Sequence, residues 1–299
     1  MAPRLLLALS FALLMSRVAA AQEQDFSKVT VKTTPIAGSV AMLEGAGGNI
    51  GVLVGPDGVV LVDDEYAPLV PKIVDAVKQL SPKPIRFVVN THWHRDHVGG
   101  NGPLGTEGVV IVAQDNVRKR MSTEQFNAFS KTTIPPSPSV ALPIITFADS
   151  VSFHLDGEDV DVVHVAPAHT DGDSVVFFKK ANVVHAGDNL FNGLYPFIDF
   201  GSGGSIDGMV AAADVMLQRC NDQTRIIPGH GPLASKADLK RFRDMLATVR
   251  DRIKKAIQEG KTLDQTVALK PTAEFDAAWG GGFLKPDAFV ALVYGGLKP

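Results

Sequence analysis

Four short apolar runs in this chain are each followed by histidine or aspartate close to glycine, and this arrangement limits what the chain can fold into. The runs are IRFVVN (85–90), DVDVVHV (159–165), NVVHAG (182–187) and RIIPG (225–229). The polar residues that follow them are His92, His94, Asp96, His97, His169, Asp188 and His230. Short β-branched runs bounded by glycine are typical of buried strands. Because strand ends can direct side chains into one pocket, we expect these seven residues to converge.

The remaining signals divide into two similar halves. The first half predicts two strands around a Pro-Asp-Gly turn (49–66), a helix (67–80), strands at 85–90 and 109–113, and a partly helical stretch (114–131). The proline-rich stretch 132–143 should be a loop that crosses between the halves. The second half predicts strands at 150–155, 159–165, 174–178, 182–188 and 224–231, with helices at 205–220, 235–259 and 286–294. This order favours an α/β fold, an αββα sandwich of two mixed β-sheets with helices on both outer faces.

The amino-terminal residues have the features of a secretory signal. One arginine precedes an apolar run from Leu5 to Met15, which is too short for a transmembrane helix, and Ala19 and Ala21 form an A-x-A site. We therefore expect residues 1–21 to be a signal peptide, residues 22–299 to form a single domain, and the protein to be periplasmic or secreted. The alternative is a buried amino-terminal helix.

Composition excludes several kinds of partner. The formal net charge is −3 and no long basic block occurs, so nucleic-acid binding is not expected. After the signal, no apolar stretch is long enough for stable membrane insertion.

Cys220 is the only cysteine, so no intrachain disulfide can form. It is better interpreted as a small buried residue than as a catalytic thiol. The oligomeric state stays open.

The cluster THWHRDH (91–97) has the residue types and spacing of a metal site. In extended chain, residues two apart point to the same side, so His92 and His94 can bind one ion. A turn at Val98-Gly99-Gly100 lets Asp96 and His97 face a second point. Zinc takes imidazole and carboxylate ligands at about 2.0–2.2 Å, and a catalytic zinc keeps a position for water. We expect His169 to complete the first set, His230 to complete the second, and Asp188 to bridge them.

Each of these residues also has a simpler interpretation when taken alone. His230 near a glycine turn is commonly a capping or packing residue, and Asp188 alone is an ordinary loop acid. His154 and His164 lie within strands and are interpreted as structural, and His185 as a packing residue or a support for the loop of Asp188. Only the density of histidine at 92–97 argues strongly for metal without help from the rest.

The order of motifs LVDD, THWHRDH, PAHTDGD, HAGD and PGHG resembles the metallo-β-lactamase superfamily over essentially the whole mature chain. The resemblance implies an αββα fold with two zinc ions per chain. His92, His94 and His169 would hold one ion, and Asp96, His97 and His230 the other. Asp63 would brace the metal loop (residues 91–97) by a hydrogen bond to one of the metal ligands. An aspartate at position 188 is shared with thioesterases of the glyoxalase II type and with lactonases, whereas β-lactamases proper usually have cysteine or serine there.

We therefore expect an exported dizinc hydrolase acting on a small molecule. Two cations would activate water towards a pKa of about 7 and polarise a carbonyl. Asp96 would be both ligand and catalytic residue, because it can orient the nucleophile or accept its proton. The preferred substrate is a cyclic amide such as a β-lactam. Alternatives are a lactone or thioester, or mononuclear iron oxidation chemistry on the same fold.

Substrate contacts are expected in the segment after Asp188. Asn192 and Tyr195 could donate hydrogen bonds to an oxyanion, and Phe191 and Phe197 could form a pocket wall. The alternative is that these aromatic residues simply pack a loop. Trp93 is expected to pack under the metal loop.

Overall fold

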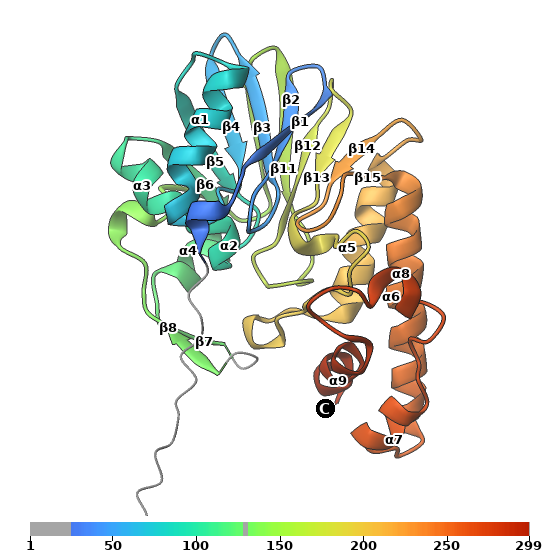
Figure 1. Ribbon diagram of the computed structural model, residues 1–299. Coiled ribbons are helices and arrows are strands. Elements are labelled where there is room, and N and C mark those ends of the chain that lie inside the picture. The colour runs from blue at the N-terminus through green and yellow to red at the C-terminus, as the bar shows by residue number, and fades with distance from the viewer. Residues whose placement is uncertain (1–24, 128–130, 299) are drawn as a thin grey trace, which may run out of the picture.

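The computed structural model of the chain describes residues 25–127 and 131–298. The predicted signal peptide at 1–21 lies outside these residues. Two β-sheets pack face to face, and helices cover both outer faces (Figure 1). No helix within the described ranges combines the length and apolar character needed to cross a bilayer.

The first sheet has seven strands in the order β1-β2-β3-β4-β5-β6-β9. They are β1 (Lys32–Ala37), β2 (Val40–Glu44), β3 (Ile50–Gly55), β4 (Gly58–Val62), β5 (Ile85–Asn90), β6 (Val110–Gln114) and β9 (Ile145–Phe147). Strands β1 to β4 are antiparallel neighbours, whereas β4, β5, β6 and β9 are parallel. This is a mixed sheet, as the sequence predicts.

The second sheet has six strands in the order β10-β11-β12-β13-β14-β15. They are β10 (Ser150–Leu155), β11 (Glu158–His164), β12 (Ser174–Phe178), β13 (Val183–His185), β14 (Arg225–Ile227) and β15 (Ala234–Ser235). All neighbours are antiparallel except β13 and β14, which are parallel. The metal-loop residues that follow β5, β13 and β14 therefore leave the two sheets at their carboxyl ends.

Alternation of side chains explains why every residue of β4 is buried. Val60 and Val62 point inward and pack against Val162 and Val176 of the other sheet. Val59 and Leu61 point outward and pack against α1 (Val70–Leu80). Because a strand buried on both faces reads as a continuous apolar run, GVVLV carries no polar position.

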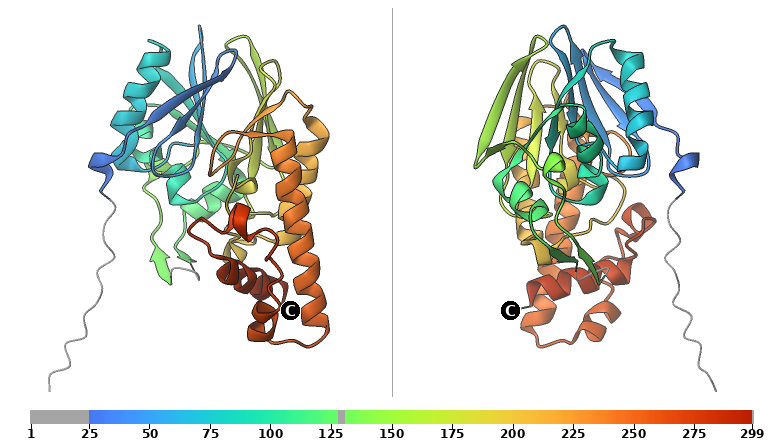
Figure 2. Two further views of the ribbon diagram at one scale, coloured as in Figure 1. Left: turned by 45° about the vertical axis from the view of Figure 1, so that its right-hand side comes forward. Right: turned by 90° about the vertical axis from the view of Figure 1, so that its left-hand side faces the viewer.

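The remaining helices lie around these layers. They are α2 (Arg95–Val98), α3 (Asn101–Thr106), α4 (Asp115–Met121), α5 (Ile206–Arg219), α6 (Lys236–Gln258), α7 (Leu263–Ala268), α8 (Asp276–Trp279) and α9 (Pro286–Leu297). Short 3-10 helices are η1 (Phe26–Lys28), η2 (Ala67–Leu69), η3 (Ser139–Ala141), η4 (Gly187–Asn189) and η5 (Phe200–Ser202). Helices α5, α6 and α9 share one hydrophobic core with the outer face of the second sheet, and the two sheets and their outer helices are seen separately in Figure 2.

Two long helices begin at the predicted caps. Ser205 Oγ accepts a hydrogen bond from the backbone of Gly208 at the start of α5, and Ser235 forms a capping box with Asp238 at the start of α6. Cys220 follows α5 and is buried, which agrees with its interpretation as a packing residue.

The crossing between the two sheets does not lie where the sequence predicted it. The proline-rich stretch begins with β8 (Thr132–Ile134), which pairs with β7 (Gln125–Asn127), and η3 follows. The chain then returns to the first sheet as β9 before it enters the second sheet as β10. The crossing is therefore at residues 148–149. The sequence did not indicate this position, because β9 is an edge strand of three residues and is too short to give a clear strand pattern.

Candidate metal centre

The cluster at 91–97 occupies the turn between β5 and α2. Strand β5 ends at Asn90, and His94 keeps extended backbone (φ −67°, ψ 146°) as the residue before α2. Asp96 and His97 lie within this single helical turn. The change from extended chain to helix separates the two pairs of side chains, so each pair faces a different point, as the spacing predicts.

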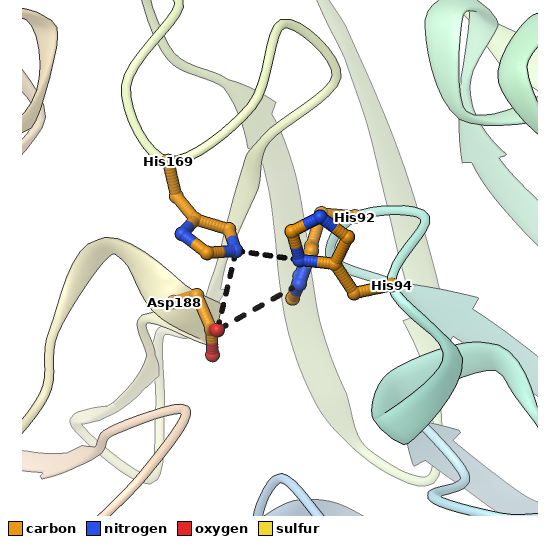
Figure 3. Close-up of side chains that lie close together, drawn as sticks. All are labelled: His92, His94, His169 and Asp188. Carbon is orange, nitrogen blue, oxygen red and sulfur yellow. Dashed lines mark hydrogen bonds and ion pairs between the residues drawn. The ribbon is translucent and has the colours of Figure 1, made fainter. Parts of the chain in front are cut away.

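The first ligand set consists of His92, His94, His169 and Asp188, and Figure 3 shows these four side chains pointing toward one another. One ligand atom from each lies within 4.8 Å of all the others. Nε2 of His169 lies 2.8 Å from Nδ1 of His94 and 3.3 Å from Oδ2 of Asp188. Nε2 of His92 lies 3.8 Å from the same carboxylate oxygen.

The second ligand set consists of Asp96, His97 and His230, whose ligand atoms also lie within 4.8 Å of one another. Oδ2 of Asp96 is 3.3 Å from Nε2 of His230 and 3.7 Å from Nε2 of His97. His97 is fully buried, whereas the side chains of Asp96 and His230 keep 25% and 24% of their surface exposed. This set therefore borders the solvent.

Asp188 lies between the two sets. Its Oδ2 faces His169 and His92, and its Oδ1 lies 3.1 Å from Nε2 of His97 and 3.5 Å from Nε2 of His230. One carboxylate thus reaches ligand atoms of both sets, as the sequence predicts.

Four of the five imidazoles are held by the ring nitrogen that faces away from the centre. His97 Nδ1 lies 2.7 Å from Asp63 Oδ2, and His94 Nε2 lies 2.9 Å from Asp199 Oδ2. The same is true of His169 and His92, whose Nδ1 atoms contact the Phe197 carbonyl at 2.8 Å and the Thr91 hydroxyl at 3.0 Å. Such contacts fix the ring and its tautomer, so the other nitrogen is free to bind a cation.

These residues fit a cation of the zinc type. Nε2 of His92 and Oδ1 of Asp188 are buried and make no hydrogen bond. A buried polar atom without a partner is costly, and a cation between the sets would satisfy both atoms. Imidazole nitrogen and carboxylate oxygen are ligands that zinc accepts. The structure therefore contains a His/Asp metal site.

The charges of the two sets differ. Burial lowers the pKa of His92, and burial also lowers the pKa of His169, to about 4. For His97 and His230 burial acts in the same direction, but Asp188 and the neighbouring carboxylates outweigh it, raising the pKa of His97 well above its usual value and that of His230 to about 9. His92 and His169 of the first set are thus neutral, whereas the second set holds protons that a cation must displace.

Comparison with known proteins decides the family. The model of the metallo-beta-lactamase superfamily matches residues 43–236, more than half of the chain. The chain belongs to the metallo-β-lactamase superfamily. It is 23% identical to a metallo-beta-lactamase type 2 of Bacteroides fragilis over 205 residues, 64% of this chain and 74% of that protein. It is 25% identical to a hydroxyacylglutathione hydrolase of Prochlorococcus marinus (strain MIT 9301) over 112 residues, 36% of this chain and 37% of that protein.

Solved structures share the metallo-β-lactamase fold. A metallo-beta-lactamase from Pontibacter korlensis matches with a TM-score of 0.60 and 19% identity over 73% of this chain and 99% of that chain. The sec-alkylsulfatase Pisa1 from Pseudomonas sp. matches with a TM-score of 0.68 and 18% identity. This match covers 88% of the present chain and 50% of the sulfatase chain. The predicted αββα fold is confirmed, and the chain is a member of a superfamily of metal-dependent hydrolases.

The prediction that Tyr195 contacts substrate is wrong for this member of the superfamily. Its side chain is buried, and its hydroxyl donates to Asp276 Oδ1 at 2.8 Å and approaches the Thr272 carbonyl at 3.3 Å. The ring stacks on Phe289 of α9 with centroids 4.6 Å apart. The hydroxyl is thus engaged by the carboxyl-terminal segment rather than directed at the metal centre.

Other residues singled out in the sequence lie close to the centre. Asn192 donates its backbone N–H to the carbonyl of His230, and Phe191 stacks on the His230 ring at 5.1 Å. The Asn192 side chain donates to the Pro232 carbonyl, so its contact with substrate stays a prediction. Trp93 is buried against Val98 and Val117, under the metal loop as expected.

The remaining histidines lie outside both ligand sets. His154 pairs with Asp159 at the surface, and His164 Nδ1 contacts the Asp173 carbonyl. His185 accepts from Gly187 N–H at 3.2 Å and its Nε2 lies 3.0 Å from the Asn49 carbonyl. It therefore supports the loop of Asp188, one of the two roles considered from the sequence.

Sequence reasoning missed two aspartates that support the metal centre. Asp199 contacts His94, and Asp173 accepts hydrogen bonds from the backbone N–H groups of His169 and Thr170. The spacing HTDGD, with an acid four residues after His169, is a signal that could have pointed to Asp173. Asp199 is followed three residues later by Ser202, whose N–H and hydroxyl it accepts, and this turn signal is too common to single it out.

Proposed function

We propose that this protein is a dizinc hydrolase that opens a cyclic amide, with a β-lactam as the preferred substrate. The observation that carries the proposal is the position of Asp188, whose two oxygens reach both ligand sets. Two adjacent three-ligand sets joined by one carboxylate suit a pair of cations that act together on one substrate. Bound zinc would supply Lewis acidity at the carbonyl and water made acidic enough to react near neutral pH.

The chain's own residues would orient the reactants. Asp96 is the partly exposed acid of the second set, and its Oδ2 faces His230 and His97. A carboxylate there can hold an attacking water and accept its proton. Asp63 keeps His97 in one tautomer, and Asp199 does the same for His94, so the ligand nitrogens are presented without a rearrangement cost. Asn192, beside His230, would contact the substrate.

The choice of a β-lactam rests on the relative from Bacteroides fragilis, which aligns over 205 residues, against 112 for the hydroxyacylglutathione hydrolase. A second candidate is hydrolysis of a lactone or thioester. Asp188 favours it, because the chain shares an aspartate at this place with thioesterases of the glyoxalase II type and with lactonases.

A substrate panel separates the two candidates. Zinc-loaded protein would be assayed with a chromogenic cephalosporin, an acyl-homoserine lactone and an acyl thioester, with Asp96→Asn as the inactive control. Cephalosporin turnover that Asp96→Asn abolishes supports the first candidate. No β-lactam turnover, with lactone or thioester cleavage in the same preparation, replaces it with the second.

Export is part of the proposal and rests on the signal-like segment at 1–21. The protein should be recovered from the periplasm or medium with a new amino terminus after Ala21. Recovery of the full-length chain from the cytoplasm alone would contradict this.

A further inference from the structure

A five-residue segment, Tyr195 to Asp199, holds two ligands of the first set in place. His169 Nδ1 contacts the Phe197 carbonyl at 2.8 Å, and His94 Nε2 contacts the Asp199 carboxylate at 2.9 Å. We call residues 195–199 the anchor segment. It has no helical or strand hydrogen-bonding pattern of its own. Its shape therefore depends on how its two ends are attached.

The Asp199 end is attached close to the metal centre. Its N–H donates to the His169 carbonyl at 2.9 Å, and its carboxylate accepts from the Ser202 N–H at 3.1 Å and the Ser202 hydroxyl at 2.6 Å. These contacts join the anchor segment directly to the loop of His169.

The Tyr195 end is attached to the carboxyl-terminal segment. Its N–H donates to the Trp279 carbonyl at 3.1 Å, its hydroxyl donates to Asp276 Oδ1 at 2.8 Å, and its ring stacks on Phe289 with planes 16° apart. Only 1% of Tyr195 is exposed. Helices α8 and α9 therefore hold this end by backbone, side-chain and ring contacts at once.

A second contact keeps α9 against the same loop. Gly296 of α9 lies so close to Phe200 that a Cβ on it would fall 1.9 Å from the Phe200 ring. Phe200 directly follows the anchor segment. Helices α8 and α9 lie on the side of this loop in Figure 1 and Figure 2. They lie outside residues 43–236, which the family model covers.

We propose that Tyr195 is a positioning residue, through which α8 and α9 set the positions of His94 and His169 and so the zinc affinity of the first set. This inference rests on the metal centre of the proposed function and not on the choice of substrate. Removing the Tyr195 hydroxyl removes one of the three contacts that hold this end of the anchor segment, so the carbonyl of Phe197 and the carboxylate of Asp199 are held less firmly. Asp63, which holds His97 of the second set, bonds to Thr91 and His97 instead of the anchor segment.

The test compares two tyrosine-to-phenylalanine variants. Tyr195→Phe keeps the ring stacked on Phe289 and loses the bond to Asp276. Tyr294→Phe is the matched control, because Tyr294 is also buried on α9 and donates its hydroxyl to the Lys261 carbonyl at 2.8 Å, away from the anchor segment. Zinc affinity is measured by competition with a chromophoric chelator, and imidazole nitrogen resonances are recorded by NMR. Asp276→Ala provides a second route to the same loss.

Tyr195→Phe and Asp276→Ala should weaken zinc binding about tenfold, the lower end of the effect of outer-shell partners. Tyr294→Phe should stay within twofold of the parent. Imidazole signals of His94 and His169 should shift, and those of His97 and His230 should not. Equal zinc affinity in Tyr195→Phe and Tyr294→Phe would overturn the proposal, as would equal shifts in all of these histidines. Absence of zinc binding by the parent protein would instead contradict the metal centre itself.

Discussion

Oδ1 of Asp188 lies 3.1 Å from Nε2 of His97, although the two residues are 91 positions apart in the sequence and follow strands of different sheets. The other oxygen of Asp188 lies 3.3 Å from Nε2 of His169. The pKa of Asp188 lies well below its usual value, because the imidazoles around it outweigh the effect of burial. The carboxylate is thus charged and faces the ligand atoms of both sets.

Asp188→Asn keeps the size of this side chain and removes its charge. Zinc content should fall from about two to about one per chain. Turnover should fall by about 10- to 100-fold or more, the range seen when metal-site partners are removed. Metal analysis after gel filtration and a rate assay measure both. Asp207→Asn, at an exposed ion pair with Lys254, is the control. An Asp188→Asn variant with full zinc content and rate would remove Asp188 from the centre.

Asp199→Asn tests the support of His94. Burial raises the pKa of Asp199, but the hydrogen bonds from His94 and Ser202 outweigh it and bring the pKa to about 2. The carboxylate is therefore charged at neutral pH, and asparagine cannot replace that charge. Zinc affinity should fall by about tenfold or more. Chelator competition at pH 7.5 gives the value, and an unchanged affinity would show that His94 needs no charged partner.

The same pKa predicts how Asp199 affects stability in the metal-free protein. Because its folded pKa lies below the unfolded value, its contribution is present above pH about 4 and is lost as pH falls towards 2. Denaturant unfolding of the parent and Asp199→Asn should differ at pH 6, and the difference should shrink as pH falls towards about 2. A constant difference over this range would contradict the assignment.

Zinc binding should release protons, chiefly from the second set. His230, with a pKa of about 9, and His97, with a raised pKa, are protonated in the metal-free protein at pH 7, whereas His92 and His169 are neutral. Calorimetry in buffers of different ionisation enthalpy should detect about two protons at pH 7. Zinc affinity of the second set should rise as pH rises to 9, while that of the first set changes little. Binding at pH 7 without proton release would be inconsistent with these charges.

Glu65 is expected to support the second set through the loop Gly45–Asn49. Its Oε2 accepts the N–H groups of Ala46 and Gly47 at 2.9 and 3.0 Å. Gly48 of this loop lies so close to His97 that a Cβ on it would fall 2.1 Å from the ring. Glu65→Gln weakens these two hydrogen bonds to the backbone of the loop. The variant should therefore lose about 1–3 kcal/mol in free energy of unfolding and bind zinc more weakly at the second set.

Glu158→Gln is the matched control for Glu65. It also accepts backbone N–H groups, those of Lys180 and Ala181, and it is also buried, but it lies in β11 away from the centre. Both variants should lose stability in denaturant unfolding. Only Glu65→Gln should lose zinc affinity, and an equal loss in Glu158→Gln would indicate a general effect of destabilisation.

The sequence predicts most of the centre because its ligands have local signatures. The density of His92, His94 and His97 after a β-branched strand is rare without metal, and Asp188 and His230 follow strands of the same kind. The layers are predicted for a related reason. The side chains of β4 point alternately to the two faces of the sheet and all are apolar, so both faces must be covered. The metal ligands and the buried strands can both be predicted from patterns that span about ten residues.

Contacts between distant segments are what the sequence did not reveal. Tyr195 follows Asp188 closely and was interpreted as a substrate contact, but its hydroxyl donates to Asp276, the first residue of α8, which lies 81 positions later. Asp199 is a single acid in a loop, and only the folded chain brings it to His94. Strand β9 has three residues, so the crossing between sheets was assigned to the prolines instead.

The most direct test is the zinc content of the purified protein together with where the zinc binds. Crystals grown with zinc should give two anomalous peaks at the zinc edge, one beside His92, His94 and His169 and one beside Asp96, His97 and His230, with Asp188 at both. One peak, peaks away from these residues, or full hydrolytic activity in protein from which all metal has been removed would contradict the account.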